Sequence, residues 1–126
     1  MGIQELAIST LSKPATMAIF LIVVLSTTPM TEGAIAEWCV ADPQAPSNLL
    51  QGALDWACRE NGTDCTTIQW NHTCYLPNTL LSHASYAFNS YRQNIKHNGG
   101  SCFFNSAAFV IETDPSYDAC HFVYVP

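Results

Sequence analysis

The chain has 126 residues, a formal net charge of −6, and 48% hydrophobic against 11% charged residues. Its acidic balance, with no basic cluster, argues against nucleic acid or an anionic membrane as a partner. It also argues against a cationic antimicrobial peptide, a common identity for short cysteine-rich chains.

The beginning of the chain predicts a signal peptide. Residues 15–25 (ATMAIFLIVVL) form an apolar run that has the length of a signal-peptide core and is too short to cross a bilayer. Lys13 precedes this run, and the small-x-small tripeptide Ala34–Ala36 follows it. We expect cleavage after Ala36, which removes residues 1–36; the alternative is an uncleaved signal anchor. Residues 37–126 then form a single domain.

The predicted mature part is acidic and rich in cysteine. Its eight carboxylates and three cations give a net charge of −5. All six cysteines lie in this part. An even count in a short secreted chain predicts three disulfides, each worth about 2–4 kcal/mol. The spacing does not decide among the possible pairings. A zinc site is the alternative, but no Cys-x-x-Cys pair supports it.

The elements can be predicted in chain order. Residues 38–41 are expected to be extended and to lead into a proline-rich turn. The first helix is expected to start at Ser47 or Asn48, because Asn48 and Gln51 have the form of a capping box. It should end near Glu60, before an Asn-Gly pair.

The second helix is expected after Asn78, a good N-cap residue, and should run to about Asn94. Aromatic and β-branched residues then predict strands at 102–105, 107–111 and 120–124. With no internal repeat or linker, the sequence indicates one α+β domain.

The second helix also contains the candidate binding residues. Its apolar positions share one face, whereas Tyr86 and Asn89 point elsewhere in an uncharged segment. An uncharged face that carries an aromatic ring suits a neutral, hydroxyl-rich ligand. We therefore predict a ligand site at Tyr86 and Tyr75, with Asn89 and Asn78 as polar partners and Trp56 as a further member.

Catalysis has little support in the sequence. Glycoside hydrolysis usually needs two carboxylates facing each other across a sugar ring. The aspartates of this chain instead have ordinary places in turns or on a solvated helix. The four histidines show no i, i+4 pair for a metal, and a nucleophile elbow is absent. We expect no enzyme activity, no metal and no cofactor.

Two N-glycosylation sequons are present. They begin at Asn61 (Asn-Gly-Thr) and at Asn71 (Asn-His-Thr). Their use would place both loops in solvent.

Several motifs occur in an order that resembles one known family. They are Trp38-Cys39-Val40-Ala41, Ala53-Leu54-Asp55-Trp56-Ala57-Cys58, Asp64-Cys65, Ile68-Gln69, Cys74-Tyr75, Pro77-Asn78-Thr79, His83-Ala84-Ser85-Tyr86-Ala87-Phe88-Asn89-Ser90-Tyr91, Cys102-x-Phe104, Thr113-Asp114-Pro115-Ser116-Tyr117 and Cys120. The chain resembles carbohydrate-binding module family 43, the plant X-eight domain of endo-1,3-β-glucanases and plasmodesmal callose-binding proteins. The resemblance covers essentially all of residues 37–126.

The resemblance implies two helices packed against a small antiparallel sheet, and β-1,3-glucan (callose or laminarin) as the ligand, without catalysis. It also implies the disulfides Cys39–Cys102, Cys58–Cys65 and Cys74–Cys120.

We expect the chain to depart from the family as a stand-alone module, with no glucanase domain upstream and no lipid-anchor signal after the last cysteine. We therefore expect a monomer secreted to the apoplast or cell wall, with plasmodesmal or plasma-membrane association as the alternative. A structural or interaction protein that keeps the scaffold without binding glucan is the second functional hypothesis. A glucan hydrolase is the third.

Overall fold

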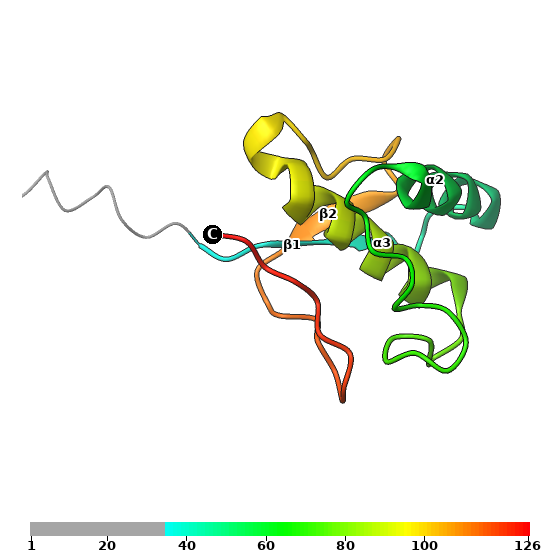
Figure 1. The fold of residues 1–126 in the computed structure, drawn as a ribbon. Helices are drawn as coiled ribbons and strands as arrows, with labels where there is room; N and C mark the ends of the chain where they lie inside the picture. The colour runs from blue at the N-terminus through cyan, green and yellow to red at the C-terminus, as the bar shows by residue number, and fades with distance from the viewer. Residues whose placement is uncertain (1–34) are drawn as a thin grey trace, which may run out of the picture. The chain divides into compact units, whose positions relative to one another are not determined.

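The computed structural model describes residues 35–126, so the predicted signal peptide lies outside the described residues except for Ile35 and Ala36. The elements in chain order are β1 (Trp38–Ala41), α2 (Ser47–Arg59), α3 (Leu80–Ile95), the 3-10 helix η2 (Lys96–Asn98) and β2 (Ala108–Ile111). β1 and β2 form a two-stranded antiparallel sheet, and α3 packs against both β1 and α2 (Figure 1). The predicted α+β class is confirmed. Within residues 35–126, no helix has the length and apolar character needed to span a membrane.

The sheet is smaller than the sequence predicts. Residues 120–124 form no strand, and only an isolated bridge joins Tyr117 to Cys120. The strand predicted at 102–105 is a turn instead, because Phe104 and Asn105 have φ angles of 50° and 55°. Positive φ is incompatible with an extended strand, so the aromatic content of this segment is misleading.

The helix starts also differ from the prediction. Thr79, not Asn78, is the N-cap of α3, and its Oγ1 accepts a hydrogen bond from the Ser82 amide at 3.1 Å. Pro46 precedes α2 without a side-chain cap, so the predicted capping box is not formed. Both helices thus begin within two residues of the predicted positions, but through other residues.

Side chains of α3 form hydrogen bonds with backbone groups on the edge of β1 that does not pair with β2. Three α3 side chains, spaced one turn apart, form hydrogen bonds with alternate residues of the extended chain. Ser85 Oγ accepts from the Ala41 amide at 3.0 Å, and Asn89 Oδ1 accepts from the Cys39 amide at 3.0 Å. Gln93 Nε2 donates to the Glu37 carbonyl at 2.8 Å. The spacing fits because four helical residues advance about 6 Å and two strand residues about 6.6 Å. The helix therefore takes the place of a third strand.

The three disulfides tie the elements together. They join Cys39 to Cys102, Cys58 to Cys65, and Cys74 to Cys120, the pairs that the resemblance implies. The first fixes β1 to the loop before β2, and the second closes the loop after α2. Together with a core centred on fully buried Phe88, they stabilise a domain too small to rely on hydrophobic burial alone.

The Cys58–Cys65 disulfide should contribute less than a long-range cross-link. Its sequence separation of 7 corresponds to a small loop-closure entropy. We expect the double substitution of Cys58 and Cys65 by alanine to lower the free energy of unfolding by about 2 kcal/mol, in a domain that still folds. Urea unfolding followed by far-UV circular dichroism measures this. A domain that no longer folds would show that the loop after α2 is essential to the core.

Candidate functional site

Two of the predicted site residues on α3 are buried. Tyr86 is only 7% exposed, and its ring packs edge-on against Phe122 with centroids 5.2 Å apart. Asn89 is 1% exposed. Its Oδ1 accepts a hydrogen bond from the Cys39 amide, and its Nδ2 donates one to the Val123 carbonyl. The prediction that this polar face of α3 meets solvent is therefore wrong. The face is polar because it bonds backbone groups of β1 and of the C-terminal segment.

Tyr75 and Asn78 lie apart from these residues, in the segment before α3. Tyr75 is half-buried beside the ring of His83, and its carbonyl is 2.6 Å from His83 Nε2. Asn78 is exposed. Trp56 lies in a different place again, on α2. The five predicted residues therefore do not form one surface: Trp56, Tyr75 and Tyr86 line three separate hollows, and none of these is lined by Asn78 or Asn89.

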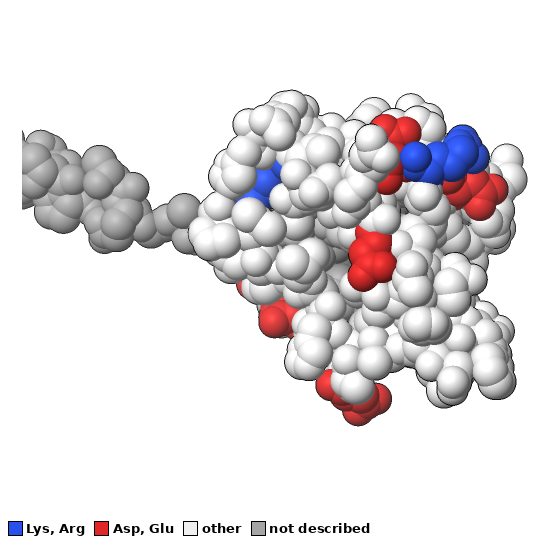
Figure 2. Space-filling view, viewed as in Figure 1, with Lys and Arg blue, Asp and Glu red and all other residues white. Residues whose placement is uncertain are grey.

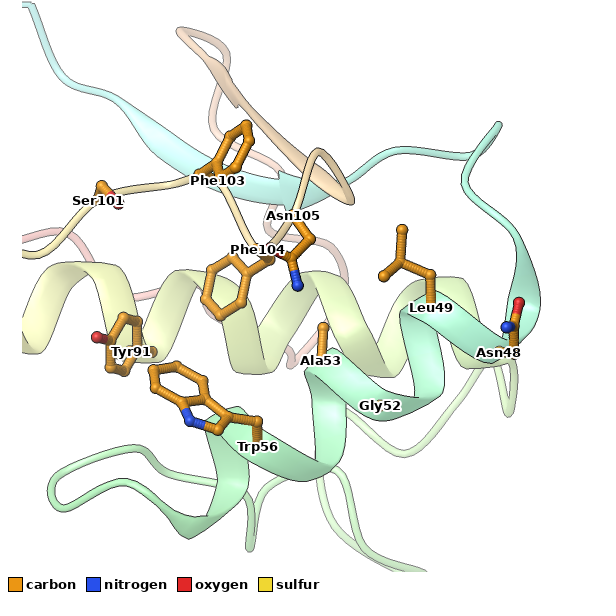
Figure 3. Close-up of a pocket in the computed structure, with 10 residues that line it drawn as sticks. All are labelled: Asn48, Leu49, Gly52, Ala53, Trp56, Tyr91, Ser101, Phe103, Phe104 and Asn105. Carbon is orange, nitrogen blue, oxygen red and sulfur yellow. The ribbon is translucent and has the colours of Figure 1, made fainter.

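The largest of these hollows, about 540 Å³, lies between α2 and the loop before β2 (Figure 3). We call it the aromatic hollow. Its lining residues are Asn48, Leu49, Gly52, Ala53, Trp56, Tyr91, Ser101, Phe103, Phe104 and Asn105. Its volume falls within the range of about 300–1,000 Å³ that is typical of ligand sites. Because it is the largest of the three hollows and is lined by four aromatic rings, it is the best candidate for a binding site.

The aromatic rings hold one another in place. Phe104 stacks on buried Phe88 with centroids 4.1 Å apart, and it meets Tyr91 and Trp56 edge-on at 5.5 Å and 6.0 Å. Trp56 also meets Tyr91 edge-on at 5.0 Å. Each edge-to-face contact adds about 0.5–1.5 kcal/mol beyond area burial. Trp56 is nevertheless 40% exposed, so part of its indole remains free for a ligand.

A left-handed turn brings the loop residues to the hollow. Phe104, Asn105 and Ser106 all have positive φ, between 50° and 69°. Consecutive non-glycine residues in this region are costly, and such strain persists only where the surroundings impose it. Here the Cys39–Cys102 disulfide and a bond from the Ala107 amide to the Phe104 carbonyl at 3.0 Å hold the turn. Figure 3 shows Phe104 turned toward Trp56 and Tyr91, and Phe103 turned away from them.

Sequence reasoning missed most of this site. Tyr91 belongs to the apolar face of α3, which gives no sign of a ligand site, and the segment containing Phe103, Phe104 and Asn105 is predicted to be a strand. One signal was available: asparagine tolerates the left-handed region better than most residues, so Asn105 after two phenylalanines could indicate a turn. Trp56 is the one predicted site residue that lies in the aromatic hollow.

The aromatic hollow is uncharged. Among its ten lining residues there is no aspartate, glutamate, lysine, arginine or histidine. The shifted pKa values belong to groups elsewhere: burial and the Arg92 cation lower the pKa of Lys96, against a smaller opposing effect of Glu37. Hydrogen bonds from Ser116 lower the pKa of Asp114. In Figure 2, the charged side chains of the visible face are likewise scattered over a largely uncharged surface.

Within residues 35–126, no group of three or more histidine, cysteine, aspartate or glutamate side chains is placed to hold a metal ion. All six cysteines form disulfides. What the hollow offers a ligand is aromatic surface together with the amide groups of Asn48 and Asn105 and the hydroxyls of Ser101 and Tyr91.

These features define a small, disulfide-bonded α+β domain with an aromatic surface hollow, and comparisons identify its family. The X8 domain model matches residues 37–109. Glucan endo-1,3-beta-glucosidase 13 of Arabidopsis thaliana is 43% identical over 93 residues, which are 74% of this chain and 18% of that protein. Major pollen allergen Ole e 10 of Olea europaea is 39% identical over 95 residues, which are 75% of this chain and 76% of the allergen. The chain belongs to the X8 domain family.

The chain matches a small part of each glucosidase but most of the pollen allergen. It spans less than a fifth of the length of the Arabidopsis glucosidases, such as 17% of glucan endo-1,3-beta-glucosidase 12. It spans three quarters of the pollen allergen. The shared part is therefore the X8 domain.

Proposed function

We propose that residues 37–126 form a secreted, non-catalytic domain that binds β-1,3-glucan in the aromatic hollow. The observation that carries this proposal is the lining of the hollow: exposed aromatic surface with amide and hydroxyl groups and no charge. Pyranose rings present C–H faces that pack on aromatic rings, and their hydroxyls exchange hydrogen bonds with amides. A neutral polysaccharide matches this lining better than an anion or a peptide with charged side chains.

The relatives supply the choice of glucan. Several matched proteins are named glucan endo-1,3-beta-glucosidases, and the X8 domain is the part that this chain shares with them. A domain attached to a glucosidase can serve by binding the same polysaccharide. This supports β-1,3-glucan rather than cellulose as the ligand.

The absence of carboxylates from the hollow supports binding without hydrolysis. Glycosidases use two carboxyl groups about 5–10 Å apart across the scissile bond. None of the ten lining residues is acidic. A glucan held there would meet neither an acid nor a nucleophile of the usual kind.

The disulfides support secretion. Three of them use every cysteine of the chain. Such cross-links form and persist in oxidising compartments, so an apoplastic or cell-wall location suits the domain.

Affinity electrophoresis tests the proposed function. The purified domain should migrate more slowly in a gel containing laminarin than in a plain gel, and cellulose derivatives should not retard it. Equal migration with and without laminarin would contradict the proposal and favour a structural role for the same scaffold.

A side chain added at Gly52 should block the hollow. Gly52 lines it from α2, and a Cβ atom built there meets no atom within 4 Å. We therefore expect Gly52→Gln to abolish the retardation by laminarin without lowering the melting temperature, since glutamine is the better helix former by several tenths of a kcal/mol. Gly52→Ala is the matched control: it should raise stability and leave more of the hollow open. Full laminarin binding by a folded Gly52→Gln protein would place the ligand elsewhere.

Binding should depend little on pH and salt. The lining contains no histidine, the side chain that ordinarily changes charge between about pH 5 and pH 8. Because the lining carries no charge, there is no electrostatic attraction between the hollow and the ligand for salt to screen. We expect the dissociation constant for laminarin to change less than about threefold across this pH range and up to molar salt. A steep loss of affinity on either axis would indicate a charged site.

A further inference from the structure

A second hollow, of about 380 Å³, lies in the segment before α3. It is lined by Trp70, Asn71, His72, Thr73, Tyr75 and Leu76. Two apolar side chains of this hollow face solvent: Trp70 is 74% exposed and Leu76 is 68% exposed. A group that covered them would remove apolar surface from water. We call it the Trp70 patch.

A sequon forms part of the Trp70 patch. Asn71, His72 and Thr73 line the same hollow as Trp70, and all three side chains are exposed. Asn71 has a φ of 68°, so the chain turns at this residue. A group attached to the Asn71 amide therefore starts at the hollow that Trp70 also lines.

The other sequon has different surroundings. Asn61 and Thr63 lie inside the loop that the Cys58–Cys65 disulfide closes. The Thr63 hydroxyl is buried without a hydrogen-bond partner, and Asn94 donates to the Asn61 carbonyl at 2.9 Å. A short loop closes at little entropic cost, so this disulfide can form early. In the folded domain, the Thr63 hydroxyl that the glycosylating enzyme must recognise is therefore inaccessible.

We propose that Asn71 carries an N-linked glycan, that Asn61 does not, and that the first sugar of this glycan packs on Trp70. The inference rests on the secretion part of the proposed function, because glycan transfer occurs in the secretory pathway. It is independent of glucan binding. The glycan is the occupant of the Trp70 patch, and it converts the apolar surface of Trp70 and Leu76 into a hydrated one.

The covalent step uses a lipid-pyrophosphate-linked oligosaccharide as the donor. Asn71 Nδ2 forms a bond to the anomeric carbon of the terminal N-acetylglucosamine. The bond from that carbon to the pyrophosphate oxygen breaks, the lipid pyrophosphate leaves with the electron pair, and the amide nitrogen loses one proton to a base. No oxidation or reduction is involved.

Mass spectrometry of the full chain expressed in a plant or insect secretory host tests occupancy. We expect the secreted protein to carry one oligosaccharide, and enzymatic release should convert Asn71, but not Asn61, to aspartate. Thr73→Ala should remove the glycan, whereas Thr63→Ala should leave it. Secreted protein with no glycan, or with Asn61 occupied, would overturn this inference alone. Retention of unglycosylated protein inside the cell would contradict the proposed secretion as well.

Fluorescence quenching tests the packing on Trp70. Acrylamide should quench tryptophan fluorescence more strongly after the glycan is released than before, and the difference should vanish in Trp70→Phe. Equal quenching of the two forms would show that the glycan leaves Trp70 uncovered. Loss of laminarin binding in a Trp70→Ala protein that lacks the glycan would instead identify the Trp70 patch as the glucan site.

Discussion

Replacing Trp56 by alanine should weaken laminarin binding by about 30-fold or more. A tryptophan at the centre of a binding site often costs 2 kcal/mol or more on truncation, and about 1.4 kcal/mol corresponds to tenfold in affinity. Trp56 is 40% exposed and meets Tyr91 and Phe104 edge-on, so it offers a ligand a free aromatic surface that its neighbours hold in place. Affinity electrophoresis or calorimetry with laminarin measures the change.

Two controls separate binding from folding in this experiment. Trp56→Phe keeps a ring in the hollow and should retain part of the affinity. Trp70→Ala removes a more exposed tryptophan outside the aromatic hollow and should leave laminarin binding unchanged. If Trp56→Ala bound laminarin as well as the unaltered protein, the aromatic hollow would not be the site.

Replacing Asn89 by alanine should destabilise the domain by about 2–6 kcal/mol. The substitution leaves the buried Cys39 amide and the part-buried Val123 carbonyl without their bonds of 3.0 and 2.8 Å, and each group left unpaired away from water costs about 1–3 kcal/mol. Domains of this size have only about 5–15 kcal/mol in total. The melting temperature should therefore fall by at least about 8 °C, or the domain should fail to fold.

The Asn89 experiment distinguishes a structural role from a ligand role. Exposed Asn78 is the matched control, and Asn78→Ala should change stability by no more than about 0.5 kcal/mol. An Asn89→Ala protein that melted normally yet lost laminarin binding would restore Asn89 to the ligand site and would contradict the helix-to-strand bonding described above.

The fold class could be predicted from the sequence because its signals are local. The apolar spacing of α2 and α3 and the β-branched residues of the paired strands lie within single elements. The hydrogen bonds along the free edge of β1 could not be predicted in the same way, because their signals are not local. Ser85, Asn89 and Gln93 are polar, and only their position opposite β1, more than 40 residues away in sequence, shows that they are buried partners. Helix phase alone assigned this face to solvent.

The candidate site could be predicted only in its general chemistry. An uncharged, aromatic and amide-bearing surface was expected, and the aromatic hollow has that character. Its position was not predicted, because it depends on the turn at Phe104 and Asn105, whose backbone angles contradict the strand propensity of the segment. Tertiary constraint, here the Cys39–Cys102 disulfide, overrides local preference.

Side-chain NMR during titration with a β-1,3-glucan oligosaccharide tests the central claim most directly. The account predicts that the indole signal of Trp56 and the amide signals of Asn48 and Asn105 shift with ligand, while the indole signal of Trp70 does not. No shift at any of these groups, or shifts confined to Trp70 and its neighbours, would contradict binding in the aromatic hollow.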